Sequence, residues 1–224
     1  MSKISIKSFT CTKCGHKGEF RMYDSINVSL DPSLREKVLS GEIFQWECPK
    51  CGATLSVRYD LLYHDMDKDF QIYYSPANCD GINKMINDML TKYSEMRKLC
   101  RTVDSLNALR EKIYIFESGL NDIAIELAKV VIKHEKQNAI PWGSELRFEK
   151  LILSEVVESH GHLVFRQLID GQPQEGLILF DKANYDNFVG EITSNDEFKM
   201  NLYCDTINEK WIIDRFSLSY DRKS

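Results

Sequence analysis

Four cysteines in the N-terminal quarter of the chain have the side chains and the spacing of a metal site. They form two matching turns, Cys11-Thr12-Lys13-Cys14-Gly15 and Cys48-Pro49-Lys50-Cys51-Gly52. In such a turn the two thiolates converge, and the glycine can take the positive φ that points backbone N–H groups at the sulfurs. Two turns supply four sulfurs, which is the closed tetrahedral set of a structural zinc site. The sequence therefore predicts that one metal ion is held by Cys11, Cys14, Cys48 and Cys51.

Zinc is the ion that this pattern favours, because it is the commonest occupant of four-thiolate sites in the cytosol. Rubredoxins use the same pair of turns to hold one redox-active iron, so iron in an electron carrier is the alternative. Two features favour zinc over iron. The ribbon segment is net positive, and His16 follows the first glycine, where rubredoxins usually have an aromatic residue.

Short strands are expected to position both cysteine turns. Residues 4–9 alternate polar and apolar side chains before the first turn, and residues 19–26 follow it as a strand. Residues 43–48 and 53–62 flank the second turn, and residues 70–74 add one more strand. This arrangement predicts a zinc-ribbon or rubredoxin-like β domain.

A helix is expected in the long gap between the two cysteine pairs. Asp31 is placed to cap it, Pro32 suits its first position, and Gly41 suits the position just past its end. Leu34 and Leu39 fall on one face, so the helix is expected to pack on the sheet.

The same segment resembles a known family. The residues that carry the resemblance are Cys11-x-x-Cys14, Ile26-Asn27-Val28-Ser29-Leu30-Asp31-Pro32, Leu39-Ser40-Gly41-Glu42-Ile43-Phe44, Cys48-Pro49-Lys50-Cys51-Gly52 and Leu62-Tyr63-His64-Asp65. Over residues 5–76 they are similar to the CpXC family, named for its Cys-Pro-x-Cys turn. The resemblance implies a ribbon-like metal fold and a prokaryotic origin, and it implies nothing about catalysis. The first turn departs from the pattern, because Thr12 stands where the second turn has Pro49.

From Gly81 the apolar residues recur at helical spacing. One stripe contains Ile82, Met85, Ile86, Met89, Leu90, Tyr93, Met96 and Leu99, and it predicts an amphipathic helix that faces the core. A second helix is expected from Asp104 to Gly119, and a third from Asn121 or Asp122 through Ile132. These helices make up a central helical segment over residues 81–137.

The C-terminal part is predicted to form an α+β unit over residues 144–221. Strands are expected at 148–157, 163–169 and 177–180, followed by a short helix that Asp181 caps. Residues 200–204 and 211–220 are expected to close an antiparallel sheet as a hairpin around Asn208-Glu209. The fold class is therefore α+β, with one domain over residues 1–78 and a second over 79–224.

Composition places the chain among ordinary globular proteins. It has no apolar run long enough to span a membrane and no secretory signal, so we expect a cytoplasmic protein. Residues 1–58 carry nine Lys and Arg against six Asp and Glu, a net charge of +3, and the remainder carries −8. This charge makes nucleic-acid binding through the ribbon a second alternative. It would use basic and aromatic side chains near the turns, namely Lys13, Lys17, Lys50 and Arg58 with Phe20, Trp46 and Tyr59.

No residue pattern points to catalysis, so no catalytic residue is assigned. His64-Asp65 is interpreted as a turn held by local hydrogen bonds, and His160 and His162 as solvated turn residues. The sequence favours a non-enzymatic module in which a structural metal folds the ribbon and the remaining surface meets a protein partner.

Overall fold

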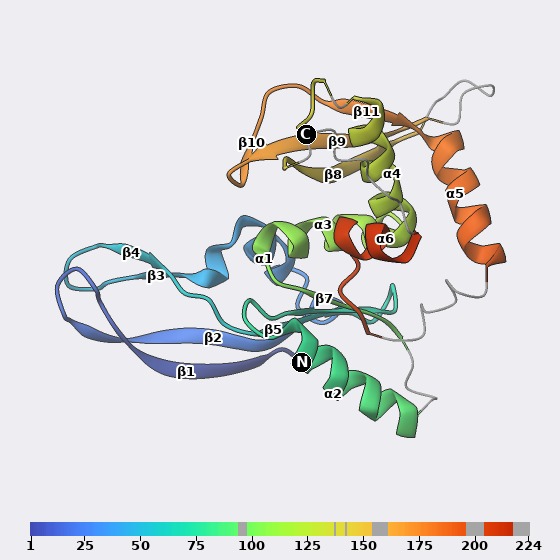
Figure 1. Ribbon diagram of the computed structural model, residues 1–224. Helices are drawn as coiled ribbons and strands as arrows, with labels where there is room; N and C mark the ends of the chain where they lie inside the picture. The colour runs from blue at the N-terminus through green and yellow to red at the C-terminus, as the bar shows by residue number, and fades with distance from the viewer. Residues whose placement is uncertain (94–97, 137, 142, 154–160, 196–203, 217–224) are drawn as a thin grey trace. The chain divides into compact units, whose positions relative to one another are not determined.

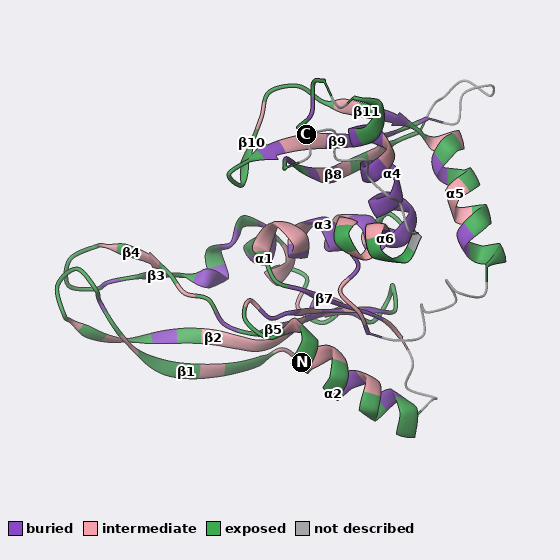
Figure 2. Cartoon of the chain, viewed as in Figure 1, coloured by how far each residue is buried: buried purple, intermediate pink, exposed green. Residues whose placement is uncertain are grey.

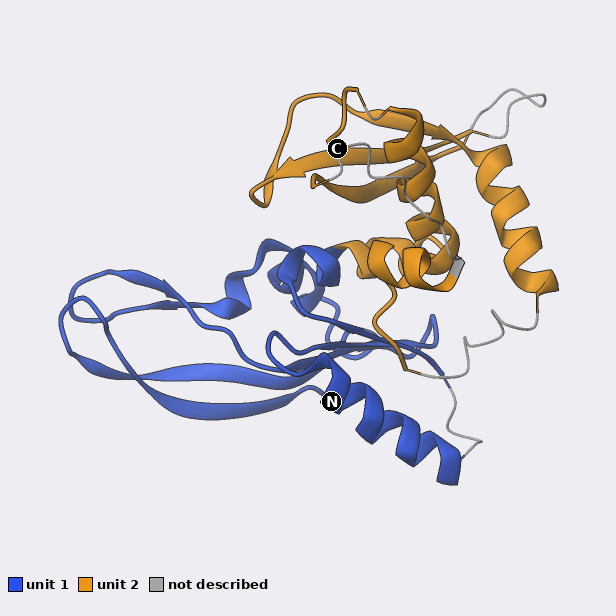
Figure 3. Ribbon diagram, in the orientation of Figure 1, with its two compact units in different colours: residues 1–110 blue, residues 111–224 orange. Residues whose placement is uncertain are grey.

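The structure is a computed structural model that describes residues 1–93, 98–136, 138–141, 143–153, 161–195 and 204–216. The chain forms two compact units, Met1–Arg110 and Glu111–Ser224 (Figure 3). Unit 1 therefore extends well past residue 78. The expectation that residues 1–78 form a separate domain stays a prediction. None of the helices in the described ranges combines the length and apolar character that crossing a bilayer requires.

Unit 1 is built on a mixed five-stranded sheet in the order β1-β2-β5-β6-β7 (Figure 1). Pairs β1–β2 and β5–β6 are antiparallel, and pairs β2–β5 and β6–β7 are parallel. A separate two-stranded sheet contains β3 and β4. The elements are β1 (Lys3–Thr10), β2 (Lys17–Asn27), α1 (Leu34–Ser40), the 3₁₀ turn η1 (Glu42–Phe44), β3 (Gln45–Glu47), β4 (Thr54–Ser56), β5 (Leu61–Asp65), β6 (Phe70–Tyr74), α2 (Cys79–Lys92) and β7 (Leu99–Val103).

Helix α1 lies in the predicted gap, but its first turn differs from the prediction. The helix begins after Ser33, and the carboxylate of Asp31 instead accepts hydrogen bonds from the backbone N–H and hydroxyl of Ser2, at 3.1 and 2.6 Å. Its end is as predicted, with Gly41 in the left-handed region at φ 82°. The Arg110 guanidinium donates to the carbonyl oxygens of Leu39 and Ser40, which α1 leaves without helical partners.

The predicted helix from Gly81 to Leu99 is only partly correct. Helix α2 ends at Lys92, and Leu99 begins strand β7, which pairs in parallel with β6. The apolar stripe is also not all in the core: Met85 and Tyr93 are 55% and 51% exposed. A stripe at helical spacing could not reveal that residues 99–103 would find a strand partner far away in the sequence.

Unit 2 contains helices around an antiparallel sheet in which β9 pairs with β8, β10 and β11 (Figure 1). The antiparallel C-terminal sheet is thus confirmed. Helix α3 carries the chain from unit 1 into unit 2. The elements are α3 (Leu106–Glu117), α4 (Asp122–Glu135), β8 (Glu145–Ile152), β9 (His162–Ile169), β10 (Gln172–Pro173), β11 (Ile178–Asp181), α5 (Lys182–Ser194) and α6 (Glu209–Phe216).

Both helix starts predicted in unit 2 are capped. Of the two residues predicted to start the third helix, Asn121 is the cap, and its side chain accepts from the backbone N–H groups of Ile123 and Ala124. The predicted cap Asp181 accepts from the N–H of Ala183.

The predicted C-terminal hairpin is wrong. Residues 209–216 form helix α6 in place of a strand, with Ile212 fully buried. Asn208 caps the start of α6, because its side-chain oxygen accepts a hydrogen bond from the backbone N–H of Trp211. The first predicted strand, at 200–204, lies almost wholly outside the described residues, as do Met96, His160 and the end of the strand predicted at 148–157.

A buried ionic cluster in unit 2 has no counterpart in the sequence prediction. Lys112 Nζ lies 3.0 Å from Asp122 Oδ2 and 3.1 Å from Glu126 Oε1. Lys129 Nζ lies 2.8 Å from Glu111 Oε2 and 3.0 Å from Glu126 Oε2. Helix α4 supplies three of these side chains, and it is buried along most of its length (Figure 2). In a sequence, charged side chains at such spacing predict a solvent-exposed helix face, so only the tertiary contacts reveal that these side chains are buried.

Candidate metal centre

The cysteine turns stand at the tips of two hairpins. The first turn joins β1 to β2, and the second joins β3 to β4 (Figure 1). Both have the same backbone hydrogen bonds: the N–H of the first cysteine donates to the carbonyl five residues on, and the N–H of the glycine donates back to that cysteine's carbonyl. The four bonds measure 2.8 to 2.9 Å. The two turns are therefore copies of one local structure that face each other.

The glycines in these turns have the backbone conformation that was predicted. Gly15 has φ 70° and Gly52 has φ 66°, both in the left-handed region that side chains with a Cβ rarely adopt. This conformation reverses the chain directly after the second cysteine, so the sulfurs of each pair stay on the inner side of the turn.

The structure brings all four predicted ligands together. Their sulfur atoms lie within 4.8 Å of one another. Cys11 Sγ is 3.7 Å from Cys51 Sγ, and Cys14 Sγ is 3.7 Å from Cys48 Sγ. A regular tetrahedron with metal–sulfur bonds of ~2.3 Å has sulfur–sulfur edges of ~3.8 Å. The two cross-hairpin distances match this edge, and the four sulfurs together are close enough to hold one metal ion.

The electrostatics of the cluster also suit a cation. Burial opposes ionisation of Cys11, but the N–H groups of Cys14 and Lys13 and the neighbouring thiols lower its pKa from 9.0 to about 7. The N–H of His16 favours the Cys14 thiolate, yet burial and the other three cysteines raise the pKa of Cys14 to about 12. One thiol ionises readily while its neighbour resists, because like charges in one site repel. A bound cation would remove this conflict, since it takes the place of the protons.

Aromatic packing beneath the sulfurs joins the two hairpins. Trp46 on β3 donates its indole N–H to the carbonyl of Glu19 on β2 at 2.9 Å, and its ring meets Phe9 edge-on with centroids 5.1 Å apart. Gly18 leaves room for this contact, because a Cβ there would lie 2.8 Å from Trp46 Cζ2. This role of Gly18 was not predicted. Its only signal in the sequence is a glycine directly before the strand predicted at 19–26.

One part of the nucleic-acid hypothesis is wrong. The three aromatic side chains assigned to base stacking, Phe20, Trp46 and Tyr59, are only 5 to 7% exposed. They form part of the core, where Phe20 packs against Tyr59 and the Tyr59 hydroxyl donates to the carbonyl of Ile43. These rings cannot stack on bases from outside. Binding through lysine charge alone stays a prediction.

Those of the other candidate residues that the structure describes, His64, Asp65 and His162, do not form a catalytic arrangement. Asp65 Oδ1 accepts from the Ser29 hydroxyl and from the backbone N–H groups of Asp67 and Lys68, so His64-Asp65 ends a strand at a hydrogen-bonded turn, as expected. Burial lowers the pKa of the adjacent His64. His162 is exposed at the start of β9.

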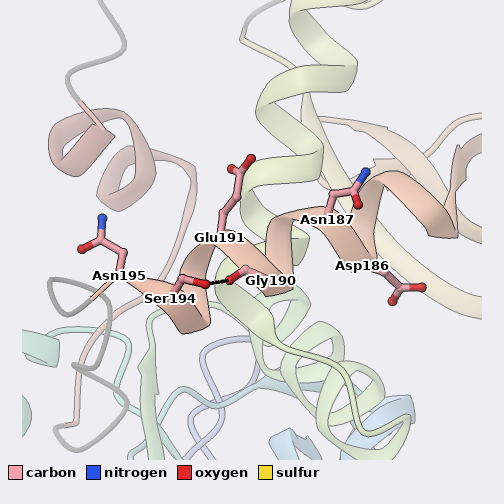
Figure 4. A pocket seen from close by; sticks show the side chains of 6 residues that line it. All are labelled: Asp186, Asn187, Gly190, Glu191, Ser194 and Asn195. Carbon is pink, nitrogen blue, oxygen red and sulfur yellow. Dashed lines mark hydrogen bonds between the residues drawn. The ribbon is translucent and has the colours of Figure 1, made fainter.

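A shallow hollow beside α5 is open to solvent (Figure 4). All its lining residues come from α5 and the residue after it: Asp186, Asn187, Gly190, Glu191, Ser194 and Asn195. Asp186 pairs with Lys182 at 2.7 Å, and the Ser194 hydroxyl donates to the carbonyl of Gly190 at 2.6 Å. These six residues do not pair a nucleophile with a base, so the cysteine cluster remains the candidate functional site.

Two hairpins with converging cysteine turns define a ribbon-like domain with a four-thiolate cluster that could bind a metal ion. A family model described as CpXC protein matches residues 9–129, which is more than half of the chain. The chain therefore belongs to the CpXC family. No curated protein and no solved structure matches it.

Proposed function

We propose that the chain is a metal-binding protein in which Cys11, Cys14, Cys48 and Cys51 hold one structural zinc ion, and that it serves as a protein-interaction or regulatory module. The observation that carries the proposal is the sulfur geometry, with two cross-hairpin distances of 3.7 Å. When bound, the ion supplies thiolate bonds that join the two hairpins.

A structural role follows from the number of ligands. Catalytic zinc sites keep one coordination position for water or substrate, whereas four cysteines occupy all four positions of a tetrahedral ion. The second hairpin also needs support, because β3 and β4 have three residues each, and so short a two-stranded sheet is not stable alone. Linking its tip to the longer β1–β2 hairpin would compensate for this weakness.

The surface of the first hairpin supports a protein partner. Ile4 and Ile6 on β1 are 39% and 65% exposed, although β1 is an edge strand of the sheet. Lys3 and Lys7 flank this pair in the strand, with Ser5 between the two isoleucines, and such lysines discourage unspecific pairing of edge strands. An exposed apolar pair between two charged residues is suited to binding the surface of another protein.

Elemental analysis of purified full-length protein, with an absorption spectrum of the same sample, tests the metal. We expect one zinc per chain and no visible bands. One iron per chain with thiolate charge-transfer bands would overturn the zinc assignment and make the chain a rubredoxin-like electron carrier.

Two cysteine variants test the ligands. Cys48→Ser should lose the metal and unfold the ribbon, because zinc-coupled folding is worth ~10–16 kcal/mol in small zinc-finger peptides. Cys79→Ser is the matched control, since Cys79 begins α2 and its thiol donates to the carbonyl of Ser75, outside the cluster. It should keep full metal content. If Cys48→Ser retains zinc and melts like wild type, the proposal is wrong.

A further inference from the structure

Helix α2 carries an exposed apolar row that the fold does not use. Met85, Met89 and Tyr93 are 55%, 40% and 51% exposed. They follow one another at intervals of four residues, so they lie above one another on one side of the helix. The adjacent row, Ile86 and Leu90, is only 5% and 3% exposed and attaches α2 to the unit. The sequence alone predicted both rows as core.

A row of charges borders this apolar row. Lys84, Asp88 and Lys92 are all exposed, and each precedes one residue of the apolar row by a single position. The three charged residues therefore form a row of their own along the helix, next to the apolar row, and their signs alternate as positive, negative, positive. A partner helix that matches this face needs its own apolar row, and beside it charges that place a negative group opposite each lysine and a positive group opposite Asp88.

We propose that this face, formed by Lys84, Met85, Asp88, Met89, Lys92 and Tyr93, binds the same face of a second copy of this chain, with the two α2 helices antiparallel. This surface is independent of the metal site. With the two-fold axis beside residue 86, Lys84 of each copy lies opposite Asp88 of the other. A two-fold interface makes every contact twice, so one complementary pair becomes two.

The apolar side chains fit in the same register. Met85 stands opposite residue 87 of the second copy, midway between Met85 and Met89 of that copy. Each of these two methionines is then displaced from it by about 3 Å along the helix axis. The methionines therefore interleave. Methionine is flexible and polarizable, so it adapts to such a contact.

The interface is small, because α2 has only 14 residues. Such a helix pair falls below the ~1,200 Å² of standard stable interfaces, so we expect a weak dimer with a dissociation constant on the order of micromolar or above. Each solvent-exposed ion pair adds little, and two of them together change affinity by about fivefold.

Sedimentation velocity of the full-length protein between low and high micromolar concentrations tests the proposal. The wild type should shift from monomer to dimer. Met85→Lys should raise the dissociation constant by about tenfold or more, because it places a charge against the methionines of the second copy. Met66→Lys is the matched control, since Met66 is also 55% exposed in unit 1 but lies in the turn between β5 and β6, outside this face, and it should leave the dimer unchanged.

The charge pairs are tested by exchange. Lys84→Asp and Asp88→Lys should each weaken the dimer by more than about fivefold, because each replaces two attractive pairs by two repulsive ones, and the double variant should return to within about twofold of wild type. A wild type that stays monomeric throughout would overturn the proposal. So would a dimer that Met85→Lys leaves intact, or one that the double exchange fails to restore. Circular dichroism of each variant verifies folding.

Discussion

Replacing Lys129 by methionine tests whether the ammonium group of Lys129 stabilises the fold by neutralising the buried carboxylates around it. The Lys129 ammonium lies within 3.0 Å of carboxylates of both Glu111 and Glu126, and its side chain is only 4% exposed. Methionine has a similar length and fills the space, so the change removes the charge and little packing. We expect a large loss of stability from this single exchange.

The magnitude follows from the partners that remain. Breaking a buried ion pair by removing one member costs about 3–5 kcal/mol, because the other charge stays buried. Here Glu126 keeps Lys112 at 3.1 Å, and Glu111 keeps the backbone N–H of Phe148 as a donor. The loss should therefore be near the lower limit, about 3 kcal/mol.

Urea-induced unfolding, monitored by circular dichroism, measures the loss of stability. The urea concentration at the midpoint of unfolding should fall by roughly 1–3 M. Lys150→Met is the matched control, because Lys150 is exposed on β8, and it should change stability by less than about 0.5 kcal/mol. Adding Glu111→Gln to the Lys129→Met variant should recover part of the loss, since the amide carries no charge.

The loss should also depend on pH. Burial raises the pKa of Glu111 in the folded protein, and removing Lys129 would raise it further. A carboxyl group with a raised folded-state pKa destabilises the fold above that pKa and stops doing so as the pH falls. The difference between variant and wild type should thus be smaller at pH 5 than at pH 8. A loss below about 1 kcal/mol at pH 8 would refute this account of the cluster.

Three further changes test other parts of the fold by the same unfolding measurement. Gly18→Ala should cost about 1–3 kcal/mol, because the new Cβ meets the Trp46 ring at 2.8 Å, and an unchanged stability would contradict this packing. Asn121→Ala should cost about 1 kcal/mol through loss of the cap of α4, and Asn121→Asp should retain most of it. Glu149→Gln should cost about 1 kcal/mol at neutral pH. Burial opposes ionisation of Glu149, but its hydrogen bonds to Arg166 and Arg147 lower its pKa below 4.5. The difference from wild type should therefore shrink as the pH falls below 4.5, and a difference that persists at pH 2 would exclude this charge effect.

The local features of the fold were predictable from sequence because short-range chemistry decides them. The cysteine turns require their glycines at positive φ, and Gly15 and Gly52 have it. The strand at 70–74 has the predicted bounds, and Asn121 caps α4 because its side chain reaches backbone groups two and three residues ahead. The four cysteines of the candidate metal site were likewise predicted from spacing alone, since each pair lies within one turn, and their sulfur atoms lie within 4.8 Å of one another.

The tertiary structure decided whatever depends on a distant partner. Residues 99–103 form a strand only because β6 offers its edge, and the same apolar spacing would suit a helix. Residues 209–216 form a helix whose Glu209 meets Lys133, 76 positions earlier in the chain. Lys129 is internal because two carboxylates offset the cost of removing it from water, and Met85 is exposed because no described residue of unit 1 covers its side of α2. Periodicity gives the faces of an element, but burial depends on what those faces meet.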